Sequence, residues 1–185
     1  MNRKKLSDAY NSIVNFNVDE EKKYLDGYLD VVTDILNHPK FEEMVNFNHH
    51  SIINCHFHSV FVSFISYKLN LLYGYSVEEA TRASLLHDFY LYDWHIVKHD
   101  ELHAWYHPKQ AKKNAELCFG ELTEKQQDMI LSHMWPLHLA PPKSKEGMIL
   151  TLADKICTCY DLMKLSNRFL PLYNEILKEA KDRVN

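Results

Sequence analysis

Apolar residues recur every three or four positions along most of this chain, which is the spacing of one face of an α-helix. They are densest at residues 52–72, where they cover more than one face, so we expect a central helix that is buried on several sides. Gly74 follows this segment and suits the C-terminus of a helix. Two amphipathic segments, at residues 6–14 and 19–36, precede the central helix.

Capping residues and prolines predict where the other helices begin and end. Ser76 and Glu79 match the capping box that starts a helix, and Thr123 with Gln126 matches it again. Further helix boundaries are expected at Asp19, His38-Pro39, Pro108 (as the first residue of a helix), Gly120, Pro136, Ser144 and Pro171. Because the chain shows no repeat, linker or convincing strand, the pattern predicts an all-α, single-domain helical bundle.

We expect this domain to have three parts that pack together. N-terminal helices at residues 1–50 would cover a core at residues 51–165, and residues 166–185 would add a C-terminal helix. Residues 90–106 are rich in aromatic residues and histidine but lack a helical period. A connection of that length without its own pattern is typical of a functional loop.

Composition and charge narrow the classes of function. Of the 185 residues, 46% are apolar and 25% charged, as in ordinary globular domains. The net charge of -4 and the lack of a basic block argue against nucleic-acid binding. No stretch reaches the ~18 apolar residues of a membrane helix and no signal core follows the N-terminus, so we expect a cytoplasmic protein without a membrane partner. The oligomeric state stays open.

The 12 histidines are the unusual feature, because most of them lie between His49 and His138. His58 falls within the central helix, and His87 and Asp88 end the helix that follows. Asp154 interrupts the apolar middle of a later helix. Each residue alone has an ordinary explanation, as a hydrogen-bonded core histidine or a helix-end carboxylate. Together they form a nitrogen and oxygen ligand set that suits iron, manganese, zinc or magnesium.

Two more histidines extend this set. His107 is expected just before a helix start and His133 just before a helix break, where both could face the same cavity. As alternatives, His107 could cap its helix and His133 could interact with a helix dipole. If both are ligands, Asp88 would bridge two divalent ions, an arrangement that activates water to hydroxide and clamps a phosphate.

The order of His58, His87-Asp88 and Asp154 resembles the H…HD…D pattern of the HD-domain superfamily. His107 and His133 resemble the extra ligands of its two-metal branch, and the resemblance covers residues 52–165. It implies an all-helical phosphohydrolase that uses metal-bound hydroxide on a nucleotide or another small phosphoester. Met134-Trp135-Pro136 stands where one branch has Gly-Tyr-Pro, which argues against cleavage of cyclic dinucleotides.

The groups that would contact substrate are less well marked. Lys155 follows Asp154 and could meet phosphate, as could Lys98 or Lys109. His95, His99 and His103 share a helical spacing, and one of them could act as a general acid. We take Asp88, Lys155 and His103 as the catalytic candidates. The alternative function is a metal-binding sensor or interaction module without turnover.

Overall fold

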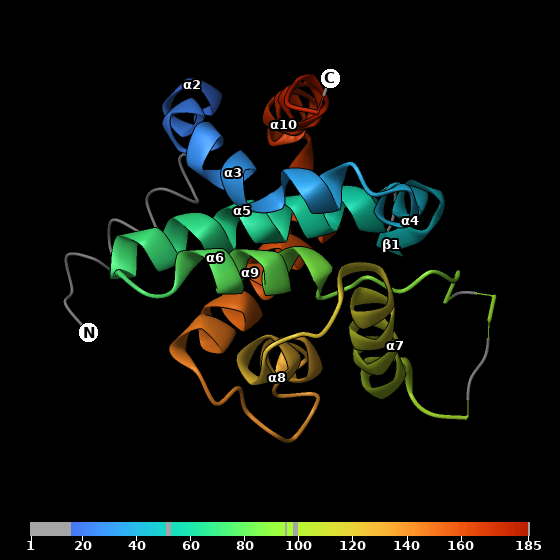
Figure 1. The fold of residues 1–185 in the computed structure, drawn as a ribbon. Coiled ribbons are helices and arrows are strands. Elements are labelled where there is room, and N and C mark those ends of the chain that lie inside the picture. Colours follow the sequence, from blue (N-terminus) through green and yellow to red (C-terminus); the bar gives the residue numbers. More distant parts are fainter. Residues whose placement is uncertain (1–15, 51–52, 95, 98–99, 185) are drawn as a thin grey trace.

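The computed structural model describes residues 16–50, 53–94, 96–97 and 100–184 (Figure 1). Its α-helices are α2 (Val18–Glu21), α3 (Leu25–Leu36), α4 (Pro39–Glu42), α5 (Cys55–Tyr73), α6 (Val77–Leu86), α7 (His103–Phe119), α8 (Glu124–Ser132), α9 (Lys145–Leu162) and α10 (Leu170–Asp182). Short 3-10 turns lie at Lys22–Tyr24, Glu43–Asn46 and Ser166–Arg168, and two strands, β1 (Asn48–His50) and β2 (Ile53–Asn54), complete the elements. The prediction of an all-α single domain is confirmed.

The central helix is α5, as its dense apolar pattern predicts. Every residue from Cys55 to Asn70 is buried, because other helices cover α5 on several sides. Figure 1 shows α5 and α6 side by side across the middle, with α3 and α10 on one side and α7 and α8 on the other. Gly74 ends α5 with φ 73°, a left-handed conformation that glycine adopts without strain.

Helices α3 and α10 form a layer over α5. Tyr28 of α3 packs edge-on against Phe64 of α5, with ring centroids 5.2 Å apart. Phe169, just before α10, stacks on Phe61 of α5 at 4.4 Å. The apolar faces of α3 and α10 therefore close the core on the side away from α7 and α8.

The first segments differ in detail from the prediction. The helix expected at residues 6–14 lies outside the described residues. The expected helix at 19–36 is divided into α2, a 3-10 turn and α3, and its cap is Asn17, whose side chain accepts a hydrogen bond from the Asp19 backbone. A strand was not expected, yet β1 and β2 form an antiparallel pair, and β2 occupies the start of the segment 52–72 that was expected to be helical.

Two other boundaries also differ. Ser76 makes no side-chain capping bond, and neither half of the capping box forms: the Ser76 backbone N–H donates to Glu146 Oε1 at 3.2 Å, and the Glu79 carboxylate pairs with Thr123 and Lys125. Helix α7 begins at His103, so Pro108 lies inside it and not at its first position. Ring contacts of His103 with Tyr90, at 5.5 Å, and Trp94, at 4.8 Å, stabilise this added turn.

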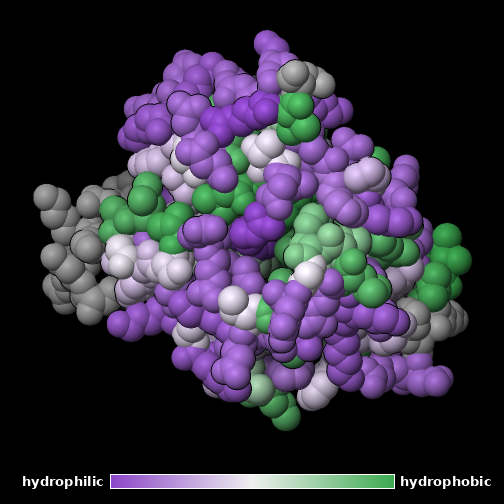
Figure 2. Space-filling view, viewed as in Figure 1, coloured by the Kyte–Doolittle hydropathy of each residue, from purple (hydrophilic) through white to green (hydrophobic). Residues whose placement is uncertain are grey.

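The outer surface carries both polar and apolar groups. The face in Figure 2 is mainly hydrophilic, with smaller hydrophobic groups between the polar side chains. Among the helices of the described residues, none combines the length and the apolar character that a bilayer crossing requires.

Candidate metal centre

Five helices deliver the predicted ligands to one buried place. His58 lies in the first turn of α5, His87 is the C-terminal cap of α6, and Asp88 follows it. His107 lies in α7 and not before a helix start, which corrects the prediction; His133 caps α8, and Asp154 lies in the middle of α9. All six side chains are buried, with at most 6% of any residue exposed. The structure therefore brings together every residue predicted to bind metal.

The first half of the cluster joins α5, α6 and α9. His58 Nε2 lies 3.2 Å from Asp154 Oδ1, and His87 Nε2 lies 3.8 Å from the same oxygen. His87 Nε2 is also 3.5 Å from Asp88 Oδ2. Metal bonds of about 2.1 Å to nitrogen and oxygen place neighbouring ligand atoms roughly 3 to 4 Å apart. These separations are thus compatible with three or four groups that share one ion.

The second half joins α7 and α8 through the other oxygen of Asp88. Asp88 Oδ1 lies 3.2 Å from His107 Nε2 and 3.5 Å from His133 Nε2. The two imidazole nitrogens are 3.0 Å apart. Because Asp88 faces the first half with Oδ2 and the second with Oδ1, its carboxylate has the position that a bridge between two ions would need.

The other ring nitrogen of each histidine fixes its orientation. Nδ1 of His87 lies 2.7 Å from the Ser84 carbonyl, Nδ1 of His107 lies 2.9 Å from the His103 carbonyl, and Nδ1 of His133 lies 2.7 Å from the Ile130 carbonyl. A carbonyl oxygen only accepts, so each Nδ1 carries a proton, and the neutral form of each ring has its Nε2 lone pair directed at the cluster. This is the tautomer that binds metal through Nε2.

His58 is oriented by a carboxylate. Its Nδ1 lies 2.7 Å from Oδ2 of Asp161, which is fully buried in α9 and also accepts a hydrogen bond from Ser166. A carboxylate behind a ligating histidine fixes the ring and makes it a stronger ligand. Asp161 was missed in the sequence, although it follows Asp154 by seven residues, a spacing that places both on one face of a helix.

Buried atoms of the cluster also fit a metal ion. His87 Nε2 and Asp88 Oδ1 are shielded from solvent and accept no hydrogen bond from the described residues. Leaving such atoms without a partner is unfavourable, and a cation between them would satisfy both. Two overlapping sets, His58 with His87 and Asp154, and His87 with Asp88 and His133, each have ligand atoms within 4.8 Å of one another. The buried His/Asp cluster could therefore bind metal.

The charges of the cluster hold the carboxylates ionised. Burial opposes the charge of Asp88, but the facing His87 and His107 outweigh it and keep the pKa of Asp88 well below its usual value. Burial likewise opposes the charge of Asp154, but the hydrogen bond to His58 and the proximity of His87 outweigh it and keep the pKa of Asp154 well below the usual value. Two carboxylates that stay ionised offer negative charge to a cation at all physiological pH values.

The histidines differ from one another in charge. Burial would lower the pKa of His58, but the hydrogen bonds to Asp154 and Asp161 raise it to about 10. Without metal, His58 is therefore an imidazolium whose proton lies where an ion would bind. Burial lowers the pKa of His133, and the proximity of His87 and His107 lowers it further against the attraction of Asp88. A neutral His133 is a ready ligand.

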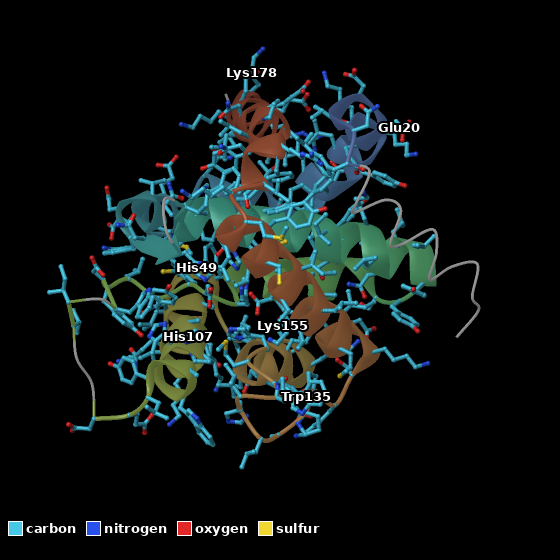
Figure 3. All side chains as sticks on the ribbon, turned by 180° about the vertical axis from the view of Figure 1, so that it is seen from behind. Glu20, His49, His107, Trp135, Lys155 and Lys178 are labelled. Atoms are coloured by element: carbon cyan, nitrogen blue, oxygen red, sulfur yellow. The ribbon has the colours of Figure 1, made fainter. Side chains whose placement is uncertain are left out.

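A cavity of about 350 Å³ opens onto the cluster. It is lined by His49, Asp88, Tyr90, Trp94, His103, His107, His133, Met134, Leu137, Asp154, Lys155, Thr158 and Cys159. Figure 3 labels His49, His107 and Lys155 around the middle of the molecule. Both predicted substrate-contacting residues, Lys155 and His103, thus face the same cavity as the ligands.

The other candidate substrate groups lie elsewhere. Lys109 does not line the cavity and pairs with Glu101 at 2.8 Å on the surface. His95, Lys98 and His99 lie outside the described residues. The sequence analysis did not identify His49 as a site residue, because the polar segment around it has no periodic pattern that would indicate burial. Only 7% of His49 is exposed, and its ring lies at the cluster.

A stack of rings leads from the cavity wall to the metal ligands. The rings of Trp94 and His103 are 4.8 Å apart at 21°, and those of His103 and His107 are 4.6 Å apart at 30°. His103 thus lies between Trp94 and His107, a candidate ligand of the second half of the cluster.

No family model, no curated protein and no solved structure matches this chain. The resemblance to the HD-domain superfamily rests on the order of His58, His87-Asp88 and Asp154 and on their convergence in a helical fold. The buried His/Asp cluster is compatible with an HD-type site.

Proposed function

We propose that this protein is a metal-dependent phosphohydrolase of the HD type that acts on a small phosphoester. The observation that carries the proposal is the convergence of imidazole Nε2 atoms and two ionised carboxylates at the inner wall of a cavity that also contains Lys155. A protein that only needed stability would gain little from so many buried polar groups without an ion.

The chain's residues divide into ligands of two ions. His58, His87 and Asp154 would hold the first ion, His107 and His133 the second, and Asp88 would be shared. Nitrogen and oxygen ligands without sulfur favour iron, manganese, zinc or magnesium. When bound, such ions supply an acidified water as nucleophile and neutralise charge on the phosphoryl oxygens.

Lys155 and His103 would act on the substrate itself. Lys155 Nζ lies 3.6 Å from Asp154 Oδ2 and 3.3 Å from the His133 carbonyl, next to both half-sites. From there its ammonium can donate a hydrogen bond to a phosphoryl oxygen. His103 can give its proton to the leaving oxygen as the bond from phosphorus to that oxygen breaks.

The cavity limits the substrate. Its volume of about 350 Å³ is at the small end of ligand pockets, and Tyr90, Trp94 and Leu137 give it apolar walls. Among the described lining residues, Lys155 is the sole lysine and arginine is absent. We therefore propose a substrate with few phosphate charges and an aromatic or apolar group, such as a nucleotide.

Metal analysis and phosphate release, made on one preparation, test this function. Purified protein should contain one to two equivalents of iron, manganese or zinc, or acquire activity with added magnesium, and it should release phosphate from some members of a nucleotide and phosphoester panel. Asp88→Asn should abolish both metal retention and hydrolysis, because Asn lacks the charge to bridge two ions. Full metal content and full activity in this variant would disprove the assignment.

The positions of the candidate ligands on five different helices favour a second possible function. They come from five helices, so an ion would also hold those helices together, as in a metal-stabilised sensor or interaction module. Treatment with a chelator separates the two functions. A sensor would lose its fold or partner binding on metal removal, whereas an enzyme would chiefly lose a measurable rate of hydrolysis.

A further inference from the structure

His49 lies on the short hairpin that leads into the central helix. Strand β1 pairs with β2 through Asn48 and Asn54, and the Cys55 backbone N–H donates a 2.9 Å hydrogen bond to the Phe47 carbonyl. Asn54 then caps α5, because its side chain accepts a 2.8 Å hydrogen bond from the Phe57 backbone. The hairpin is therefore attached to the first turn of α5, and it holds His49 beside His58.

The contacts of His49 point into the first half-site. Its Nε2 lies 3.0 Å from Asp88 Oδ2, the oxygen that also faces His87. Its ring stacks on the ring of His58 with centroids 3.8 Å apart and planes 16° apart. Ligand atoms of His49, His58 and Asp88 lie within 4.8 Å of one another, as in the sets already assigned to metal.

The 3.0 Å between His49 Nε2 and Asp88 Oδ2 matches the roughly 3 to 4 Å that separates neighbouring ligand atoms on an ion with bonds of about 2.1 Å. We infer that His49 is a further ligand of the first ion, which is then held by five protein groups, whereas three groups hold the second ion. The five are His49, His58, His87, Asp88 and Asp154, and the three are Asp88, His107 and His133. This inference rests on the metal centre of the proposed function.

Because the two ions would have different numbers of protein ligands, we expect them to exchange with solution at different rates. An ion with five protein ligands keeps few positions for water and leaves the protein slowly. An ion with three keeps open positions, as catalytic sites do. The ion held by Asp88, His107 and His133 would thus exchange readily and lies nearest His103, which stacks on His107.

Graded removal of metal tests this asymmetry without any substrate. Protein loaded with Mn²⁺ is dialysed against increasing chelator, and the metal per chain is measured by mass spectrometry. The wild type should lose its ions in two separate steps. His49→Gln should lower the affinity for the more tightly bound ion by about tenfold to a hundredfold or more. Mutation of a residue that only orients a metal ligand has an effect of about tenfold to a hundredfold, and loss of a ligand should have at least that effect. His133→Gln should remove the weaker step and leave the tighter one.

His56→Gln is the matched control. His56 is also a buried histidine, two residues from His58, but its Nδ1 forms a 2.9 Å hydrogen bond with the Tyr173 hydroxyl, away from the cluster. Both metal steps should survive in this variant. Release curves of His49→Gln that coincide with those of the wild type, or a change in the weaker step alone, would overturn the inference.

A second variant gives a positive signal if His49→Gln folds poorly. His49→Cys, titrated with Co²⁺, should show the charge-transfer absorption of a thiolate bound to cobalt, above the baseline of the wild type. His56→Cys should show none. Absence of the band from a folded His49→Cys protein that binds cobalt overturns the inference. If metal is lost in two steps and His49→Gln weakens the tighter one, but no substrate is hydrolysed, the inference about His49 is supported and the proposed phosphohydrolase function is rejected.

Discussion

His107 Nε2 and His133 Nε2 lie 3.0 Å apart, although neither nitrogen carries a proton when both rings are neutral. Each ring already donates its Nδ1 proton to a backbone carbonyl of its own helix. In that neutral state the two lone pairs face each other and repel, and the nearby Asp88 adds negative charge. A cation between the rings removes the repulsion, so the pair is oriented for an ion before the ion arrives.

Asp161→Asn should reduce metal affinity by about tenfold to a hundredfold, as is usual for the partner behind a ligating histidine. Asn can still accept the hydrogen bond from His58 Nδ1, but it lacks the charge that strengthens the ligand. Competition with a metal indicator measures the change. Asp34→Asn, which removes a surface partner of Arg82, should bind metal as the wild type does. Equal affinity in both variants would exclude this role for Asp161.

The metal-free protein should lose stability as the pH rises from about 6.5 to about 10. Folding raises the pKa of His58 from 6.5 to about 10, because its hydrogen bonds to Asp154 and Asp161 outweigh the effect of burial. The folded state then binds more protons than the unfolded state within this window. The contribution is complete below the lower value and is lost as the pH passes the upper one.

Chemical denaturation at several pH values checks this window. His58→Gln should reduce the slope of the free energy of unfolding against pH, since the titrating group is gone. Metal-loaded protein should also show a smaller slope, because the ion replaces the proton on Nε2. The same exchange means that metal binding strengthens as the pH rises toward 10. A slope of the opposite sign in metal-free wild type would contradict the prediction.

Lys155→Gln should lower kcat/KM for phosphoester hydrolysis by about tenfold to a hundredfold, the effect of losing one hydrogen bond to a charged group. Metal content should stay unchanged, because the ammonium is not a ligand. Lys178→Gln provides the control, since Lys178 is exposed on α10 and lies far from the centre in Figure 3. A normal rate in Lys155→Gln would show that Lys155 is surface charge and not a phosphate contact.

His103→Gln should slow hydrolysis by about a hundredfold or more for substrates with poor leaving groups, because general acids contribute on that scale. Substrates with an activated leaving group, such as nitrophenyl phosphate, need no proton and should react nearly as fast as with wild type. His38→Gln, a change at the N-terminal cap of α4, serves as control. Equal losses for both kinds of substrate would assign His103 to binding and not to proton transfer.

The elements that sequence patterns predicted well are those with a local cause. The dense apolar run gives α5, and the side chains of Thr123 and Gln126 form the predicted capping box of α8. The candidate ligands were predicted from the order of histidine and aspartate residues along the chain and not from any three-dimensional arrangement. Their distances could not be predicted, because they depend on how five helices pack.

Several of the missed features depend on contacts between segments that are apart in the sequence. The Glu79 carboxylate does not form the predicted capping box with Ser76 and instead contacts Thr123 and Lys125, more than forty residues away. His103 starts α7 early because Tyr90 and Trp94 pack against its ring. His49 comes to the cluster through a hairpin too short to show an alternating pattern. A single sequence contains no local signal for such contacts.

Two of the candidate metal-binding histidines also terminate helices. His87 ends α6 and His133 ends α8, and each satisfies a carbonyl three residues earlier that the helix leaves without a partner. A mutation that removed either ring would therefore remove a hydrogen bond at a helix end as well as a potential metal ligand. Binding of an ion at these two positions would therefore depend on the same side chains that end α6 and α8.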